Sequence, residues 1–301
     1  MTLIILLYAL FASSFSMGKI LLRYTEPIFL TGSRMSIAGI ILLAYQYFCP
    51  IASFRFKKKH WKLYAQITLF GIYFNYILRF WALDYLPSSK TSFFYNFSPL
   101  ISALYSYLIF NEKLTKRQWI GLTIGFVGMI PLLIGSSPDE QKTGEWFFIS
   151  LPELAVIGSV ALHSYSWIIV RKLVREKSYS PIMVNGLCMT FGGLLALATS
   201  LPVEGFLPVN NYSSFFGWLT LVILISNIIC HNLYGHLLKK YSATFLSFAG
   251  FLAPIFASLY GWAFLQEKIT WNLYLSGAIV LLGLYLFYRD EHEEVPDQTV
   301  P

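Results

Sequence analysis

The sequence predicts an all-α integral membrane protein with ten transmembrane helices, arranged as two inverted five-helix repeats. Its 301 residues are 56% hydrophobic and only 12% charged, with a mean hydropathy of +0.59. Apolar runs of roughly 18 to 25 residues, the length that a helix needs to cross a ~30 Å hydrocarbon core, recur along nearly the whole chain. The chain also matches itself at an offset near 155 positions.

The apolar runs define the predicted spans. We expect the first span to be retained rather than cleaved as a signal peptide, because it lacks a basic start and nine more spans follow. The acidic segment 290–301 has no apolar face, so we expect a disordered tail in the cytoplasm. The ten spans lie at about 2–22, 27–49, 63–86, 88–110, 117–135, 150–171, 181–202, 214–237, 242–265 and 271–288.

Positive charge gathers in alternate loops of a chain whose net charge is +7. The loops after spans two, four, six and eight hold 14 Lys and Arg residues, whereas the other loops hold 5. The positive-inside rule places the basic loops, and with them both termini, in the cytoplasm. We therefore expect a multi-pass protein of the cytoplasmic (inner) membrane, in contact with lipid, and no nucleic-acid partner.

The self-match covers most of each half of the chain. Because each unit has five crossings, an odd number, the second unit must enter the membrane from the opposite side, so the repeat is inverted. We place the first repeat at 1–145 and the second at 146–289, with a substrate site near the midplane between them. Aligned pairs include Pro99 with Pro254, Glu112 with Glu267, Gly32 with Gly186, Gly39 with Gly193, and the stretch ALFASSFSMGKILLR with ALHSYSWIIVRKLVR.

The closing part of each repeat carries a family resemblance. In SPLISALYSYLIFNEKLTKRQWIGLTIGFVG and APIFASLYGWAFLQEKITWNLYLSGAIVLLG, an apolar helix with a proline leads to a Glu-Lys-x-Thr turn and a glycine-bearing helix. With ten spans and Arg34 in the second, the chain resembles EamA-type members of the drug/metabolite transporter superfamily. It departs from many members in the first span, where ALFASSFSMGK replaces a Trp-Gly-x-Asn-like stretch. The resemblance implies alternating-access transport of a small organic metabolite.

Charged side chains within the spans are costly, so they usually face a cavity or a partner. Arg34 in the second span and Arg79 in the third could each hold a substrate carboxylate with a bidentate guanidinium fork. A structural pair or snorkelling is the alternative, for Arg79 with nearby Asp84. Glu153 in the sixth span could bind a substrate ammonium or carry a coupling proton, or it could be an interfacial residue just after Pro152.

Polar and aromatic residues on several spans suit a cavity that stacks a flat or cationic ligand and hydrogen-bonds its polar edge. Lone histidines there could contact a ligand or be satisfied core residues. Neither the cysteines nor the histidines match a metal motif, so we expect no metal and no cofactor. The candidate substrate-binding residues are Arg34, Arg79, Asn75, Tyr76, Trp81, Tyr95, Glu153, His163, Trp167, His231 and Asn232.

Two further patterns concern helix geometry. Pro99 and Pro254 lie mid-span at matched positions, where each removes a backbone hydrogen bond, and we expect two symmetric hinges. The turn that contains Glu112 is expected to be structural, with Thr115 capping the next helix and Gln118 completing a capping box. A gate or ion-coupling role for Glu112 is the alternative.

These observations favour a secondary transporter of a small molecule, coupled to a proton or a counter-substrate. An amino-acid-like zwitterion with a flat group, either an aromatic amino acid or an S-adenosylmethionine-type molecule, is the favoured substrate. Drug or polyamine efflux is the alternative, and an integral membrane enzyme is a distant one, since no catalytic cluster and no Walker A signature is found. Gly121 and Gly125 form a GxxxG pair that we expect to pack within the chain, giving a monomer or weak dimer.

Overall fold

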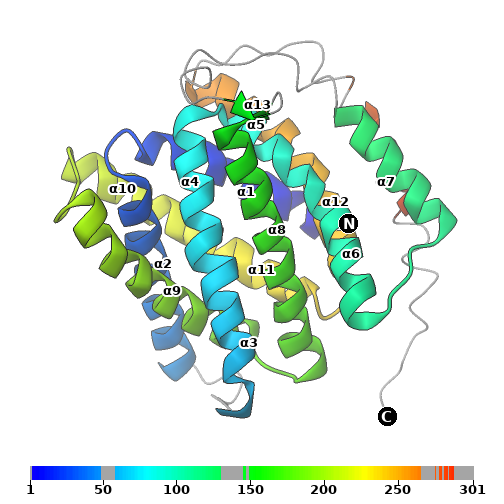
Figure 1. Cartoon of the computed structure of the whole chain (residues 1–301), viewed down its shortest axis with the longest axis horizontal. Helices are drawn as coiled ribbons and strands as arrows, with labels where there is room; N and C mark the ends of the chain where they lie inside the picture. The colour runs from blue at the N-terminus through cyan, green and yellow to red at the C-terminus, as the bar shows by residue number, and fades with distance from the viewer. Residues whose placement is uncertain are drawn as a thin grey trace.

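The computed structural model of the chain describes residues 2–48, 58–129, 145–146, 149–265, 275, 278–279, 281–283 and 285–287. Nearly all of them are helical, and β1 (Glu145–Trp146) and β2 (Ile149–Ser150) form one antiparallel pair before α8 (Figure 1). Half of the tenth predicted span, the predicted tail at 290–301 and the second Glu-Lys turn, which contains Glu267, lie outside the described residues.

The first half begins with two uninterrupted helices and continues with two interrupted ones. The helix α7 follows (Figure 1). The elements are α1 (Thr2–Leu21), α2 (Pro27–Phe48), η1 (Lys58–His60), α3 (Trp61–Gln66), the π-helical η2 (Ile67–Phe74), α4 (Asn75–Tyr85), α5 (Ser88–Phe94), the 3-10 turn η3 (Tyr95–Phe97), α6 (Ser98–Phe110) and α7 (Lys116–Met129).

The second half repeats this order. After α8, the helix α9 is again uninterrupted, and the two helices that follow are again broken by a π-helical segment and a 3-10 turn. The elements are α8 (Leu151–Arg171), η6 (Lys172–Glu176), α9 (Pro181–Glu204), α10 (Tyr212–Val222), the π-helical η7 (Ile223–Cys230), α11 (His231–Leu237), α12 (Ala243–Ala249), the 3-10 turn η8 (Gly250–Leu252) and α13 (Ala253–Leu265).

Among the described residues, seven helical stretches are long and apolar enough to cross a membrane. Where the structure describes them, the helices agree closely with the predicted spans, which confirms the all-helical membrane fold. The seven stretches are Thr2–Leu21, Pro27–Phe48, Lys90–Phe110, Leu151–Glu176, Pro181–Glu204, Tyr212–Leu237 and Ala243–Tyr260.

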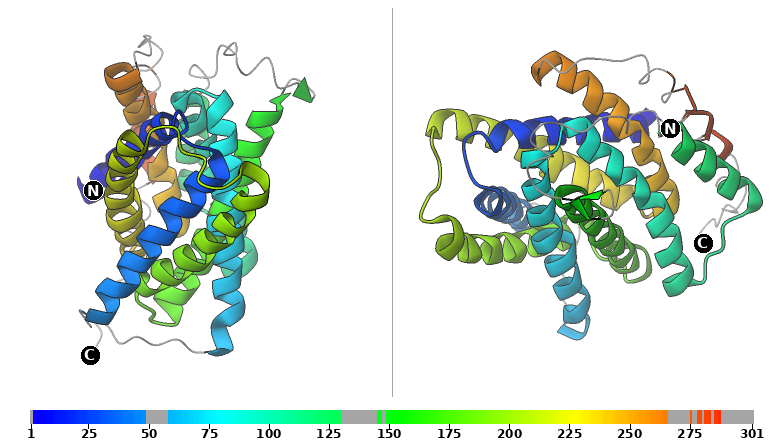
Figure 2. Two further views of the ribbon diagram at one scale, coloured as in Figure 1. Left: turned by 90° about the vertical axis from the view of Figure 1, so that its left-hand side faces the viewer. Right: turned by 45° about the horizontal axis from the view of Figure 1, so that its top comes forward.

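The two halves meet where α2 crosses α9 (Figure 2, left). Small residues allow the crossing, since a Cβ on Gly39 would strike Thr190 and a Cβ on Gly193 would strike Ser36. These two contacts are exchanged by the 154-residue offset of the repeat, because Ser36 aligns with Thr190. Each half therefore presents the same surface to the other.

The direction of these contacts shows that the repeat is inverted. A Cβ on Gly32 would lie 2.7 Å from the Leu197 nitrogen, whereas Gly39 faces Thr190. As residue numbers increase along α2, the numbers of the residues that they contact on α9 decrease. The two helices therefore run antiparallel about an axis between them. Two further contacts obey the same exchange: α1 packs on η7 and α13, while α8 packs on η2 and α6.

The broken helices also match between the halves. Pro99 and Pro254 are each the second residue of a helix that follows a 3-10 turn, η3 or η8. Each proline lies mid-span, as predicted, but it begins a new helical segment instead of kinking a continuous helix. Proline suits this place because the first turn of a helix needs no donor from its nitrogen. Their role as hinges stays a prediction.

The turn between α6 and α7 has the predicted cap. Asn111 ends α6 in the left-handed region, with φ of 56°. The nitrogen of Thr115 donates to Gln118 Oε1 at 2.9 Å, and the nitrogen of Gln118 donates to Thr115 Oγ1 at 3.1 Å. This is a capping box, which confirms the predicted cap of α7 and leaves the role of Glu112 open.

The GxxxG pair on α7 packs within the chain, as expected. A Cβ on Gly121 would meet the carbonyl oxygen of Gly283 at 2.7 Å, and a Cβ on Gly125 would meet the ring of Phe251. Both glycines thus serve close helix packing inside one molecule.

Candidate functional site

A cavity of about 60 Å³ lies between the two halves. Its walls come from α1, α4 and the α5–α6 span of the first half, and from α8, α11 and the α12–α13 span of the second. The lining residues are Tyr8, Phe11, Ser14, Phe15, Tyr76, Arg79, Tyr95 and Ser98 from the first half, and His163, Trp167, His231, Tyr234, Ser247, Gly250 and Ala253 from the second.

The cavity lies on the two-fold axis of the repeat. The sequence offsets that define the repeat exchange most of its lining residues, which is the arrangement expected of a midplane site in an inverted-repeat transporter. The lining is not chemically symmetric, because apolar or small residues on one side align with polar or aromatic ones on the other. The aligned pairs are Phe11 with His163, Phe15 with Trp167, Tyr95 with Gly250, and Ser98 with Ala253.

Arg79 is the charged centre of the cavity. Its side chain is 5% exposed, and its guanidinium carbon lies 4.3 Å from the Tyr76 ring centre, 4.9 Å from that of Phe80 and 5.4 Å from that of Phe15. Nε and Nη2 have no hydrogen-bond partner among the described residues. A buried cation held mainly by aromatic faces leaves much of its fork for a ligand. The cavity lining has no carboxylate among the described residues.

Arg34 is fully buried but lies one layer outside the cavity. Its Nε donates to Asn227 Oδ1 at 2.6 Å and its Nη2 donates to Ser226 Oγ at 2.7 Å. Its guanidinium carbon lies 5.4 Å from the ring centre of Tyr76, which does line the cavity. The partners on η7 and the ring of Tyr76 thus hold Arg34 behind the cavity wall.

His231 joins two hydrogen bonds at the cavity wall. Its Nδ1 lies 2.6 Å from the carbonyl oxygen of Ser226, and its Nε2 lies 2.8 Å from the hydroxyl of Tyr76. A carbonyl can only accept, so Nδ1 carries the proton, and in the neutral ring Nε2 accepts from Tyr76. The histidine therefore fixes Tyr76, which in turn lies between Arg34 and Arg79.

A second polar group fixes Tyr95. Its hydroxyl donates to Asn75 Oδ1 at 3.2 Å, and Ser159 Oγ donates to the same oxygen at 2.7 Å. Nearby, Trp167 Nε1 donates to His163 Nε2 at 3.0 Å. Asn75 is fully buried and supports the cavity without lining it.

The structure brings together six of the eleven candidate residues as lining: Tyr76, Arg79, Tyr95, His163, Trp167 and His231. Three others lie elsewhere. Trp81 is 36% exposed and packs on Tyr85, with ring centres 5.4 Å apart. Asn232 accepts from Asn185 Nδ2 at 3.1 Å and donates to the carbonyl of Ile228.

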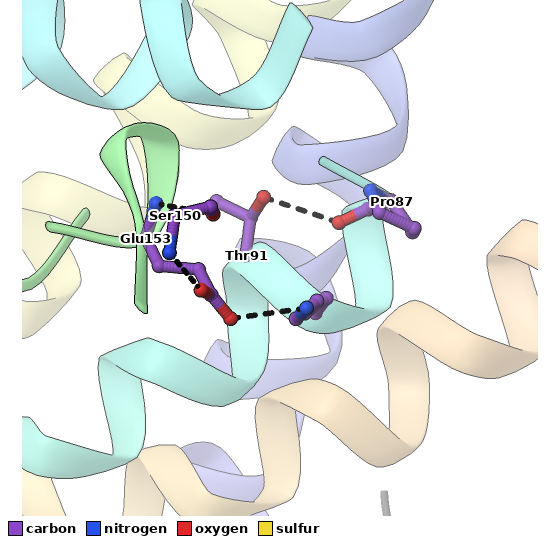
Figure 3. Close-up of polar contacts among 5 residues, drawn as sticks. Pro87, Thr91, Ser150 and Glu153 are labelled. Carbon is purple, nitrogen blue, oxygen red and sulfur yellow. Dashed lines mark hydrogen bonds and ion pairs between the residues drawn. The ribbon is translucent and has the colours of Figure 1, made fainter. Parts of the chain in front are cut away.

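Glu153 is the third candidate that does not line the cavity, and Figure 3 shows its polar contacts. The backbone nitrogen of Ser150 donates to its Oε2 at 2.7 Å, and its own nitrogen donates to Ser150 Oγ, so that Glu153 closes a capping box at the start of α8. Oε1 also pairs with Lys90 Nζ at 3.0 Å. These contacts support the interfacial interpretation of Glu153.

Several lining residues escaped the sequence analysis. Tyr8, Phe11 and Phe15 on α1 are spaced three and four residues apart and so share one face. Tyr234 lies one turn beyond His231, and its ring centre is 4.2 Å from that of Trp167. The α1 spacing was the available signal, but lipid-facing aromatic residues recur at similar intervals.

The lining suits a ligand that carries both a carboxylate and a flat or cationic group. Arg79 supplies the fork for the carboxylate, and the surrounding rings supply faces for stacking or for a cation. Pockets for molecules of that size measure about 300–1,000 Å³, well above the volume found. The cavity must therefore widen to admit such a ligand. No group of metal-ligating residues occurs within the described parts of the chain.

Comparison with known proteins identifies the class of protein. The model of the EamA-like transporter family matches residues 1–134 and again residues 150–289. A solved crystal structure shares the fold, with a TM-score of 0.72 at 18% identity, covering 97% of this chain and 96% of the other.

Named relatives are similar over nearly the full length. The S-adenosylmethionine/S-adenosylhomocysteine transporter of Chlamydia muridarum (strain MoPn / Nigg) is 36% identical, covering 95% of this chain and 90% of that protein. Its namesake from Chlamydia trachomatis serovar L2 is 35% identical, covering 95% and 88%. An uncharacterized transporter of Synechocystis sp. is 26% identical, covering 92% and 86%. The chain belongs to the EamA-like transporter family.

Proposed function

We propose that this transporter exchanges S-adenosylmethionine for S-adenosylhomocysteine across the cytoplasmic membrane by alternating access. The observation that carries the proposal is the unpaired fork of Arg79 within a ring of aromatic side chains at the interface of the halves. Both molecules join an amino-acid carboxylate to a flat adenine. The 36% identity to a protein with this named activity supports the same substrate.

The lining argues for this substrate over the alternatives. A polyamine carries several cations and no carboxylate, so it would bring its charges against Arg79 with no acidic lining residue among those described. An aromatic amino acid has the carboxylate and a flat ring, and it remains the second candidate because it satisfies the same fork.

Exchange fits the lining better than proton coupling does. With no acidic lining residue among those described, a carboxylate is not at hand to carry a coupling proton through the cavity, and the lining histidines His163 and His231 already accept a hydrogen bond at Nε2 in the neutral ring. We place both termini and the basic loops in the cytoplasm, with Pro99 and Pro254 as the hinges of alternating access and the monomer as the working unit. The proposal gives the chain no catalytic step.

Counterflow in proteoliposomes tests the proposal. Vesicles preloaded with unlabelled S-adenosylhomocysteine should accumulate labelled S-adenosylmethionine, whereas empty vesicles and vesicles without protein should not. S-adenosylmethionine carries one more positive charge than S-adenosylhomocysteine, so an inside-negative potential should speed the exchange, with about 2.3 kcal/mol available per 100 mV. Counterflow of phenylalanine or tyrosine, without counterflow of S-adenosylmethionine, would show that an aromatic amino acid is the substrate instead.

A further inference from the structure

A second hollow lies between the two halves, at the end of the bundle where α6, α8 and α11 stop (lower side of Figure 1 for α6 and α8). We call this the basic end. The hollow measures about 230 Å³. Four cations and one carboxylate line it, namely Lys113, Arg171, Arg175, Lys240 and Glu112.

A face of α6 leads from the central cavity to this hollow. Ser98, Ser102 and Ser106 are four residues apart, so they follow one another along one side of the helix. Ser98 lines the central cavity and Ser106 lines the basic hollow. On the opposing helix α12, Ser247 lines the cavity and Thr244 lines the hollow. Hydroxyl-bearing side chains of α6 and α12 thus lie between the two spaces.

Weak contacts close this route in the structure. Ser98 and Ser164 hydroxyls lie 3.0 Å apart, and those of Ser102 and Ser247 lie 2.9 Å apart. Ser106 Oγ is buried, with the residue 2% exposed, and has no hydrogen-bond partner among the described residues. Hydroxyl pairs between membrane helices are easily exchanged for a polar ligand, and an unsatisfied buried hydroxyl favours the arrival of one.

An ion pair between Glu112 and Arg171 lies in the lining of the basic hollow, at the end of this route. Arg171 Nη1 donates to Glu112 Oε2 at 2.7 Å and Nη2 donates to Oε1 at 2.5 Å, while the guanidinium carbon lies 4.8 Å from the Phe110 ring centre. The Arg171 side chain is 7% exposed and that of Glu112 is 39% exposed. This bidentate pair ties the end of α6 to the end of α8.

The same two spans are tied at the opposite end by Lys90 and Glu153. Eighteen residues of α8 separate Glu153 from Arg171, which at 1.5 Å per residue is about 27 Å, close to the ~30 Å thickness of the hydrocarbon core. The two ion pairs therefore lie near the two membrane faces, and only the Glu112 pair lies beside the serine route.

We propose that substrate moves between the central cavity and the basic end along the serine face of α6, between α6, α8 and α12, and that the Glu112–Arg171 pair is the gate. The proposal rests on the central cavity as the substrate site, and it is independent of which substrate binds there. Glu112 then has the gating role that was the alternative to a purely structural turn.

Thiol labelling tests the gate without substrate. Single variants Ser98→Cys, Ser102→Cys and Ser106→Cys are made in a chain whose native cysteines are replaced, and a charged thiol reagent is added from the basic side of vesicles. Breaking the pair with Glu112→Gln or Arg171→Gln should speed labelling at positions 98 and 102 by about tenfold or more, because the bidentate contact that ties α6 to α8 is then lost. Glu153→Gln, which breaks the pair at the other end, is the matched control and should leave these rates unchanged.

Several outcomes would overturn the proposal. Equal labelling rates at positions 98 and 102 with the pair intact and broken would show that the pair is not a gate. Labelling only from the opposite side would show that the substrate does not follow this route. If a single gate variant fails to insert, the swapped variant Glu112→Arg/Arg171→Glu replaces it, and fast labelling of that restored pair would also contradict the gate. Protection of position 98 by S-adenosylhomocysteine is scored separately: its failure counts against the proposed substrate, with the gate judged on the rates alone.

Discussion

Replacing Arg79 should weaken binding of ligands that carry a carboxylate and spare those that do not. Arg79→Gln removes the charge and the fork while leaving a side chain of similar polarity in the cavity. Hydrogen bonds to charged groups contribute about 1.5–3 kcal/mol, so S-adenosylhomocysteine should bind about 10- to 150-fold more weakly. Arg79→Lys keeps the charge but loses the fork, and an intermediate loss of about tenfold is expected.

The assay is a double-mutant cycle between protein and ligand. Equilibrium binding of S-adenosylhomocysteine is compared with that of 5′-methylthioadenosine, which keeps the adenine and the thioether but lacks the amino-acid group. In Arg79→Gln, the affinity for S-adenosylhomocysteine relative to that for 5′-methylthioadenosine should fall by the same factor of about 10 to 150. Arg79→Gln loses the ring contacts of the guanidinium but also removes a buried charge whose Nε and Nη2 are unpaired, so the thermal stability of the unliganded variant should change little. An equal loss for both ligands would refute the role of Arg79 as the carboxylate partner.

Three further predictions follow from the packing and the charge pattern. Asn227→Ala removes the acceptor that holds the buried Arg34, so it should lower the stability by about 1.5–3 kcal/mol, seen as a lower melting temperature in detergent, without changing the ligand affinity ratio. Gly39→Ala and Gly193→Ala should each cost about 1–3 kcal/mol by forcing α2 from α9, and a neutral result at either would contradict the symmetric crossing. Lys177→Cys should react with an impermeant thiol reagent only from the cytoplasmic side, and labelling of intact cells would reverse the proposed orientation.

The spans and their inversion could be predicted because the membrane limits the structures that a chain can adopt within it. Only helices of a narrow length range satisfy backbone groups within lipid, so each apolar run sets one helix with little freedom. The matched glycines on α2 and α9 also indicated where the two halves meet. No larger residue than glycine allows the helices to pack so closely at Gly39 and Gly193.

The site was harder to predict, because sequence gives the depth of a residue but not the direction it faces. Arg34 and Arg79 are both buried cations, yet only contacts from η7, a distant segment, show that Arg34 is held outside the cavity and Arg79 is not. Trp81 looked like a cavity residue from its neighbours, but it follows Arg79 by two positions and therefore faces another side of the helix. Glu153 could be placed only when its cap and Lys90 were seen together.

A structure of the purified transporter with S-adenosylhomocysteine is the most direct measurement of the central claim. We expect the ligand between the two halves, with its carboxylate on the Arg79 fork, its flat group against rings such as Trp167 and Tyr95, and a cavity larger than the one described. A ligand found at another place, or found in the central cavity with its carboxylate away from Arg79, would contradict the account.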